Sequence, residues 1–289
     1  MNIEGRPASH PPPCEELTFG LLAGGMRLQA KVILPPDTQL TGPRPSLVFL
    51  HEGLGSITQW RSFPQALARA TGLPALVYDR CGHGKSEART RPPDPSYLEL
   101  EAWERLPQVL AAVGIEAPIL VGHSDGATIA LLHAARFPKG PSSPRAVIAE
   151  AAHVFVEPQS LQGIWRTLRE YETSDLRQRL RRHHGDQVDA MFHGWSDVWL
   201  SPAFRDWNML DRLPEIRCPV LAMQGELDEY GTPDQIQAIL LGVSGPAEGL
   251  LLPGCAHIPH LQARDAALDG MVRFIASALG QDPESRAQV

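Results

Sequence analysis

The amino-acid sequence predicts an α/β protein with a mostly parallel sheet, and three patterns support this prediction. Short continuous apolar runs alternate with segments of helical length, which is typical of parallel strands covered by helices on both faces. One run leads directly into the turn Gly122-His123-Ser124-Asp125-Gly126 and then into a segment of helical character. The alternation stops over residues 155–213, where the pattern favours helices alone. A chain of 289 residues has room for one large α/β domain with such an insertion.

Eight apolar runs are predicted to form the strands. The first two are β-rich, and the later ones are short and continuous, as expected for strands buried on both faces. In chain order the predicted strands are Leu17–Leu22, Leu28–Leu34, Leu47–Leu50, Ala75–Tyr78, Ile119–Val121, Ala146–Ala149, Pro219–Met223 and Leu250–Leu252. Between and after them, helices are predicted near Trp60–Ala70, Tyr97–Val113, Ala127–Leu132, Pro233–Leu241 and Ala267–Leu279.

The interruption between the sixth and seventh strands is interpreted as a helical cap. Four helices are predicted there: Leu161–Glu170, Asp175–His184, Gln187–Phe192 and Trp195–Trp199. Four tryptophans fall in the same segment: Trp165, Trp195, Trp199 and Trp207. An insertion at this point would lie over the carboxyl edge of the sheet, where open α/β sheets bind ligands. We expect at least one of these tryptophans to face a pocket and most of them to pack the insertion together.

The chain is therefore divided into a core, a cap and two terminal segments. Residues 15–154 and 214–280 are assigned to the α/β core and residues 155–213 to the cap. Residues 1–14 are proline-rich and are predicted to be a flexible arm, and residues 281–289 a flexible tail.

Composition excludes several classes of function. A formal net charge of −7 argues against nonspecific nucleic-acid binding. No run of about 18 apolar residues suggests a membrane span, and the N-terminus lacks the apolar region of a secretory signal. The four cysteines are scattered without a C-x-x-C spacing, which predicts neither a metal site nor disulfides. A cytoplasmic protein with free thiols is expected, and the residues leave open whether it forms a homodimer.

The turn around Ser124 has the pattern of a nucleophile elbow. A G-x-S-x-G sequence between a strand and a helix forms a sharp turn, and glycines on either side of the serine avoid clashes with neighbouring backbone. The serine is then presented at a helix N-terminus, where free N–H groups favour negative charge. Ser124 is therefore the candidate nucleophile.

A serine nucleophile needs a base that is held by a third group. Asp228 follows the seventh predicted strand and His257 follows the eighth, so that Ser124, Asp228 and His257 come in the order expected for this architecture. Spacing alone does not separate Asp228 from Glu226 and Glu229, or His257 from His260.

The segment His51-Glu52-Gly53-Leu54-Gly55-Ser56 follows the third predicted strand and is the candidate oxyanion loop. Its glycines allow backbone N–H groups to approach a developing oxyanion. One donor is expected from the N–H of Gly53 and the other from the N–H of Asp125.

Taken together, these segments resemble the α/β-hydrolase family over nearly all of residues 15–280. The matching segments are His51–Gly55 with Trp60, Asp79–Ser86, the elbow, Gly225–Asp228 and Ala256–His260. The resemblance favours Asp228 as the acid and His257 as the base. It implies eight strands, mostly parallel, with helices on both faces, a helical cap after strand six, and no metal or organic cofactor.

Two positions depart from the family pattern. The family usually has His-Gly where this chain has His51-Glu52, and Gly-His where it has Ala256-His257. A carboxylate at Glu52 opposes an oxyanion unless it is turned away, paired or protonated. Glu52 is predicted to lie close to the Ser124 pocket, where it holds a substrate group or a water, or belongs to a buried hydrogen-bond network. The candidate pocket residues are Glu52, His51, Trp195, Trp199 and His260.

The sequence thus predicts a serine hydrolase that cleaves a small carboxylic ester through an acyl-enzyme on Ser124, with a small-molecule substrate and neither nucleic acid nor membrane as partner. A thioesterase, a lactonase and a hydrolase of carbon–carbon bonds use the same triad and stay open. A non-catalytic ligand receptor on the same fold is the alternative of another class, against which an intact triad weighs.

Overall fold

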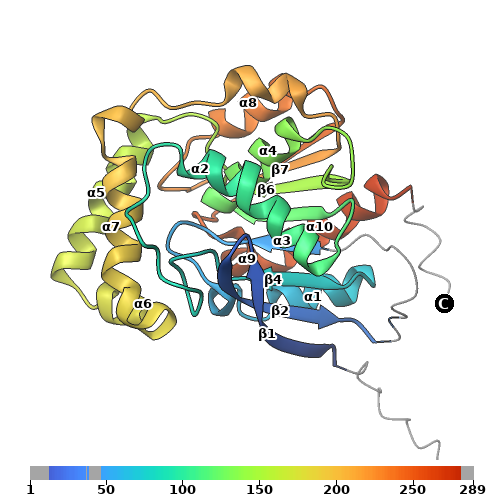
Figure 1. Ribbon diagram of the computed structural model, residues 1–289. Coiled ribbons are helices and arrows are strands. Elements are labelled where there is room, and N and C mark those ends of the chain that lie inside the picture. The colour runs from blue at the N-terminus through green and yellow to red at the C-terminus, as the bar shows by residue number, and fades with distance from the viewer. Residues whose placement is uncertain (1–12, 37, 39–46, 281–289) are drawn as a thin grey trace, which may run out of the picture.

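The computed structural model describes residues 13–36, 38 and 47–280. Its core is an eight-stranded sheet in the order β1-β2-β4-β3-β5-β6-β7-β8 (Figure 1). The strands are β1 (Glu15–Ala23), β2 (Met26–Leu34), β3 (Leu47–Leu50), β4 (Ala75–Tyr78), β5 (Ile119–His123), β6 (Ala146–Glu150), β7 (Val220–Gly225) and β8 (Ala247–Leu252). The β1–β2 and β2–β4 pairs are antiparallel, and all other pairs are parallel. The predicted α/β class with a mostly parallel sheet is confirmed.

Helices cover both faces of this sheet. Outside the insertion the helices are the 3-10 helix η1 (Ile57–Trp60), α1 (Phe63–Thr71), α2 (Tyr97–Leu100), the π-helical turn η2 (Glu101–Arg105), α3 (Leu106–Val113), α4 (Asp125–Arg136), α8 (Asp234–Gly242), α9 (Pro259–Gln262) and α10 (Arg264–Ala278). On one face, α3, α4 and α8 pack against side chains such as Val48 and Leu120. On the other face, α1 and α10 pack against their strand neighbours Phe49 and Val121. Alternate residues of one strand thus serve opposite core layers, which is why the central strands are apolar over most of their length and carry polar residues at their carboxyl ends.

The parallel pairing brings several strand ends to one edge of the sheet. Leu50 at the end of β3 is paired with Gly122 of β5, and His123 of β5 is paired with Glu150 at the end of β6. Loops that leave these strands therefore start side by side, which places residues from distant parts of the sequence in one site.

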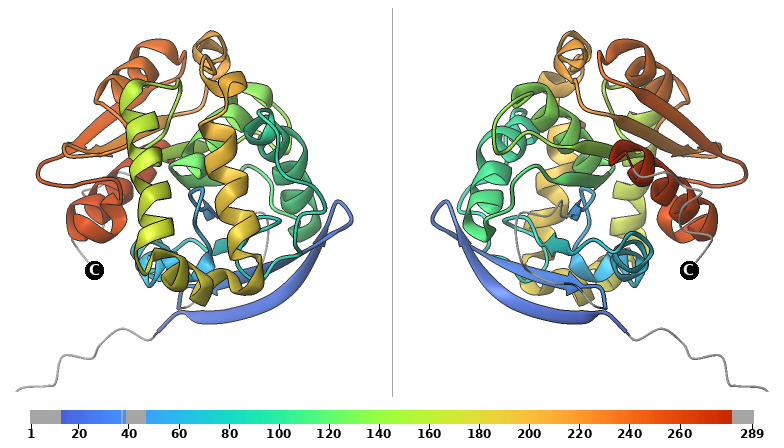
Figure 2. Two further views of the ribbon diagram at one scale, coloured as in Figure 1. Left: turned by 90° about the vertical axis from the view of Figure 1, so that its left-hand side faces the viewer. Right: turned by 90° about the vertical axis from the view of Figure 1, so that its right-hand side faces the viewer.

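Three α-helices, with short 3-10 helices between and after them, lie between β6 and β7, beside this carboxyl edge (Figure 1). They are α5 (Pro158–Thr173), α6 (Leu176–His184) and α7 (Val188–Trp199). Figure 2 shows α5 and α7 running alongside each other, with α6 joining them at one end, and α5 contacts α7. The assignment of residues 155–213 to a cap domain, with the other domain boundaries, stays a prediction.

Some predicted element boundaries are wrong. Residues 188–199 form one helix rather than two, since a helix tolerates Gly194 at a cost of about 1 kcal/mol and this glycine lies close to Pro93. The last strand starts at Ala247 rather than at Leu250, because Ala247, Glu248 and Gly249 also pair with β7 although they form no continuous apolar run. The terminal segments that were predicted to be flexible lie outside the described residues, except for residues 13 and 14. Within the described part of the chain, no helix has both the length and the apolar character needed to cross a bilayer.

Candidate active site

Ser124 sits at a strained turn between β5 and α4. Its backbone has φ 52° and ψ −118°, and a positive φ is rarely adopted by a residue with a side chain. A Cβ on Gly122 would lie 2.3 Å from the carbonyl oxygen of Gly126, and a Cβ on Gly126 would lie 1.9 Å from that of Leu50. Both glycines are therefore required for the backbone to pass this closely. The Ser124 N–H donates to the carbonyl of Glu150 at 2.8 Å and ties the turn to β6.

Asp228 and His257 form a hydrogen-bonded pair beside this turn. Nδ1 of His257 lies 2.8 Å from Oδ1 of Asp228, which also accepts the N–H groups of Tyr230 at 2.9 Å and Gly231 at 3.3 Å. Burial disfavours both charged forms, yet the His257 charge and these hydrogen bonds lower the pKa of Asp228. In the same way the carboxylate of Asp228 outweighs burial and raises the pKa of His257.

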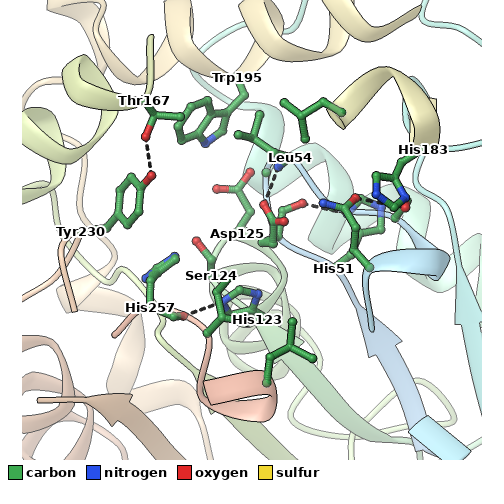
Figure 3. A pocket seen from close by; sticks show the side chains of 18 of the residues that line it. His51, Leu54, His123, Ser124, Asp125, Thr167, His183, Trp195, Tyr230 and His257 are labelled. Carbon is green, nitrogen blue, oxygen red and sulfur yellow. Dashed lines mark hydrogen bonds between the residues drawn. The ribbon is translucent and has the colours of Figure 1, made fainter. Parts of the chain in front are cut away.

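The structure brings this pair to Ser124. The ring of His123, the chain neighbour of Ser124, lies 5.1 Å from the ring of His257, and its Nε2 is 2.8 Å from the His257 carbonyl oxygen. Ser124 and His257 both line one cavity, at whose floor Figure 3 shows them. Because Nδ1 of His257 is occupied by Asp228, its Nε2 is the nitrogen left for the serine hydroxyl.

The competing residues of the two loops have other partners. His260 donates its backbone N–H to Oε1 of Glu150 at 2.6 Å, and its Nδ1 lies 2.9 Å from the same oxygen. Glu229 accepts the backbone N–H of His257 at 3.2 Å, and Glu226 accepts that of Gly254 at 3.2 Å. Of the two histidines, only His257 bonds to a carboxylate of the loop that follows β7.

Glu150 was not singled out in the sequence. Its side chain is fully buried, and although burial raises its pKa, the charge and hydrogen bonds of His260 lower it overall. Its backbone carbonyl accepts the N–H of Ser124, and its carboxylate accepts the backbone N–H of His260, which follows the loop that carries His257. The one available signal was an acidic residue at the end of an otherwise apolar strand.

Arg80 and Gly55 orient the candidate oxyanion loop. The carbonyl oxygen of Glu52 accepts hydrogen bonds from the Arg80 guanidinium at 3.0 Å and from the Gly55 N–H at 3.0 Å. In a trans peptide the C=O and the following N–H point in opposite directions, so these contacts turn the N–H of Gly53 away from Arg80. This leaves the N–H of Gly53, a residue on the cavity wall, free to serve as a donor there.

His51 lies beneath this loop. It is buried, its Nε2 accepts the Arg80 N–H at 3.0 Å, and its Nδ1 lies 2.8 Å from the Glu52 carbonyl oxygen. These partners require a neutral ring with the proton on Nδ1, in keeping with the lowering of its pKa by burial. Although His51 also touches the cavity, both of its ring nitrogens are used in hydrogen bonds to backbone groups, one of Arg80 and one of Glu52.

The Glu52 side chain is half-buried on the cavity wall. Its Oε2 accepts the N–H of Leu54 at 2.6 Å. Burial raises its pKa, while the Leu54 hydrogen bond and the His257 charge oppose that rise. A carboxyl group therefore faces the space in front of Ser124 and does not point into bulk solvent.

The cavity has a volume of about 500 Å³ and combines apolar and polar walls. Trp195 and Trp199 of α7 line it, with Ile164 of α5, and Figure 3 shows Trp195 on the side opposite His257. A hydrogen bond between the hydroxyl groups of Thr167 and Tyr230 forms part of the wall. The other two tryptophans of the insertion lie outside this set: Trp165 is exposed, and Trp207 stacks on Phe204. The cavity suits a small organic molecule with a polar group.

Two further buried polar residues on this wall were missed in the sequence. Nδ1 of His153 and Oγ of Ser160 have no hydrogen-bond partner among the described residues. Burial lowers the pKa of His153 to about 4, so that its ring is neutral 6.0 Å from the ring of His257. Isolated His and Ser residues carry no sequence signal, so only the fold reveals them.

No group of three or more His, Cys, Asp or Glu side chains within the described residues is arranged to hold a metal ion. The four cysteines are free thiols.

Comparison with known proteins agrees with this architecture. A family model described as the alpha/beta hydrolase fold matches residues 45–212. The chain is 36% identical over 94 residues to mouse (Mus musculus) sn-1-specific diacylglycerol lipase ABHD11, which covers 32% of this chain and 29% of that protein. It is 33% identical over 95 residues to a proline iminopeptidase of Levilactobacillus brevis, which covers 32% of this chain and 31% of that protein. The chain thus spans about a third of the length of these curated relatives.

A solved structure matches over most of the chain. The 2-hydroxy-6-oxo-6-phenylhexa-2,4-dienoate hydrolase of Rhodococcus sp. strain RHA1 gives a TM-score of 0.73 at 18% identity, covering 91% of this chain and 99% of that chain. At this identity the likeness shows the fold.

Proposed function

The chain belongs to the α/β-hydrolase fold family, and we propose that within it the protein is a serine hydrolase that cleaves a small carboxylic ester. The observation that carries the proposal is the His257–Asp228 hydrogen bond of 2.8 Å beside the strained Ser124 turn. A serine hydroxyl is a weak nucleophile, and a histidine held in one tautomer by a buried carboxylate activates it.

In the proposed reaction, the Ser124 oxygen attacks the acyl carbon while Nε2 of His257 takes the hydroxyl proton. Asp228 holds Nδ1–H and stabilises the imidazolium that forms. The N–H groups of Gly53 and Asp125 bind the developing oxyanion. His257 then gives its proton to the leaving alcohol, and an acyl-enzyme remains on Ser124. A water attacks this ester with His257 again as base, which releases the acid and restores the serine.

The size and lining of the cavity support a small substrate. Glu52 on its wall disfavours an anionic acyl group beside the oxyanion loop, since a second negative charge there meets a carboxyl group. A neutral ester therefore fits this wall better than a substrate whose carboxylate lies against Glu52. Thioester, lactone and carbon–carbon bond hydrolysis need the same triad and are the competing activities.

A fluorophosphonate probe tests whether Ser124 is an activated nucleophile. Rapid labelling of the wild type at Ser124, absent in Ser124→Ala, supports a hydrolase and excludes a non-catalytic receptor. Short-chain aryl esters, acyl-coenzyme A thioesters and lactones are then compared by kcat/KM, with Ser124→Ala as the blank. The ester assignment fails if a thioester, a lactone or a ring-fission product is turned over far faster than every ester.

A further inference from the structure

The helix α7, which belongs to the insertion, contacts one candidate oxyanion donor, Gly53, directly and reaches the other, Asp125, through Tyr97. Trp195 and Trp199 lie one helical turn apart on α7 and both line the cavity. Trp195 packs on the backbone of Gly53, because a Cβ there would lie 2.3 Å from Cδ1 of the indole. The glycine thus allows the tryptophan to lie directly on the oxyanion loop.

Trp199 reaches the second donor through Tyr97. Its indole N–H donates to the Tyr97 hydroxyl at 2.8 Å, and that hydroxyl donates to Oδ2 of Asp125 at 2.7 Å. All three side chains are at most 5% exposed. Burial and the Asp125 charge raise the pKa of Tyr97 well above its ordinary value, so the phenol keeps the proton that it donates.

The same network continues to the first donor. Oδ2 of Asp125 lies 3.8 Å from the guanidinium of Arg80, which is itself fully buried. That guanidinium binds the carbonyls of His51 at 3.3 Å and Glu52 at 3.0 Å and thereby sets the direction of the Gly53 N–H. One connected set of buried polar groups therefore runs from α7 to the peptides on both sides of the oxyanion position.

We propose that Trp199, Tyr97, Asp125 and Arg80 form a positioning network through which α7 sets the geometry of the oxyanion hole. This inference rests on the proposed function. It adds that the oxyanion hole stabilises the transition state only when α7 is packed against Gly53 and Tyr97. Tyr97 and Arg80 lie off the cavity wall, so their effect is on transition-state stabilisation rather than on substrate binding, whereas Trp199 also lines the cavity. Removing one oxyanion donor costs about 10²–10³ in kcat, and a displaced donor costs part of that.

The experiment uses Tyr97→Phe, which removes the shared hydroxyl and keeps the ring. The matched control is Tyr171→Phe, which removes a hydroxyl bonded to Asp189 at 2.5 Å elsewhere on the insertion. The rate of fluorophosphonate labelling of Ser124 is measured with kcat and KM for an aryl ester. We expect Tyr97→Phe to slow labelling and lower kcat at least tenfold with KM changed less than twofold, and Tyr171→Phe to change neither rate by more than twofold.

A double-mutant cycle separates one network from two independent contacts. Trp199→Phe removes the indole N–H from the same hydroxyl, so Tyr97→Phe combined with Trp199→Phe is expected to be no slower than the worse single variant. If the rate losses of the two single variants multiply in the double variant, the network is overturned. It is also overturned if Tyr97→Phe folds and its Ser124 is labelled at the wild-type rate. If Tyr97→Phe does not fold, Trp199→Phe is judged by the tenfold loss in labelling rate and kcat alone, because Trp199 also lines the cavity and its replacement affects KM directly. An unlabelled wild-type Ser124 is a different result, because it overturns the proposed function itself.

Discussion

At the scale of single residues, two histidines that are close together in the sequence bind different carboxylates. His257 pairs with Asp228, whereas His260 pairs with Glu150. Both rings use Nδ1 for this contact, but only His257 is bonded to a carboxylate of the loop that follows β7, as a catalytic base requires. Replacing Ser124 or His257 with Ala is therefore expected to remove several orders of magnitude in kcat, and the two losses should be similar because the residues act as one unit. Ester hydrolysis by purified variants, with folding checked by circular dichroism, measures this.

His260→Ala should lose far less activity than His257→Ala but more stability. It leaves the fully buried Glu150 carboxylate without its ring partner, which typically costs about 3–5 kcal/mol. Urea unfolding measures the loss, and the double variant His260→Ala with Glu150→Gln should recover part of it, because the uncompensated charge is gone. If His260→Ala were the inactive variant and His257→Ala the active one, the assignment of the base would be wrong.

Glu52 is the residue whose side chain the family pattern does not anticipate. Glu52→Gln keeps its shape and can still accept the Leu54 N–H, but it removes the negative charge near His257. If the charge acts on catalysis, kcat should change by more than about tenfold, which is roughly 1.4 kcal/mol, or the pH–rate profile should move. If Glu52 only fixes the loop, urea unfolding should show the loss instead. Unchanged activity, pH profile and stability together would contradict both roles.

At the scale of elements, the elbow depends on how closely α4 approaches β3. Gly126→Ala would put a methyl group 1.9 Å from the Leu50 carbonyl, which is backbone and cannot turn away. Alanine is the better helix former by about 1 kcal/mol, so any large loss must come from this contact. We expect a loss of more than about 3 kcal/mol in urea, as for other severe core clashes. Gly20→Ala is the control, because a Cβ at Gly20 meets nothing within 4 Å.

Elements also show why some of the site was predictable from sequence. The elbow and the loops that carry Asp228 and His257 each follow a strand, so the apolar runs were enough to locate these loops, and the resemblance to the family then favoured Asp228 and His257 within them. Arg80, Tyr97 and Glu150 form their important contacts over separations of 28 to 110 residues. Such contacts depend on which loops and helices meet in three dimensions, and no local pattern encodes that. The structure also joins the two helices predicted at Gln187–Phe192 and Trp195–Trp199 into the single helix α7.

At the scale of the whole molecule, activity and stability respond differently to pH. The base must be neutral, and Asp228 raises the pKa of His257, so kcat/KM should rise with pH around a midpoint above the ordinary value of about 6.5. Asp228→Asn should move this midpoint to lower pH and lower the plateau by roughly 10⁴. A pH–rate profile of both proteins measures the shift, and a midpoint that moved upward would contradict the assignment of the acid.

Stability should instead be governed by the histidines that the fold keeps neutral. Burial lowers the pKa of His123 to about 3 and those of His153 and His184 to about 4. Each of these histidines binds a proton more readily in the unfolded chain. Its contribution to the free energy of unfolding is therefore complete above about pH 6.5 and is lost as the pH falls toward the pKa of the histidine in the folded protein. His257 has the opposite sign, since its raised pKa stabilises the fold below about pH 6.5 and that contribution disappears at higher pH.

Three of these histidines have a lowered pKa and only His257 among them has a raised one, so the free energy of unfolding should fall as the pH is lowered. At pH 5 each depressed group is about 1.5 pH units below its unfolded pKa, which corresponds to roughly 2 kcal/mol. His184 holds the Gly84 N–H at 2.9 Å and lies near the Leu54 carbonyl at 3.0 Å, so α6 should detach from the core loops as this ring takes up a proton. Urea unfolding at pH 7.5, 6 and 5 measures the slope, and His153→Gln should reduce it by removing one such group. A free energy of unfolding that stayed constant over this range would mean that these rings are not buried as neutral groups.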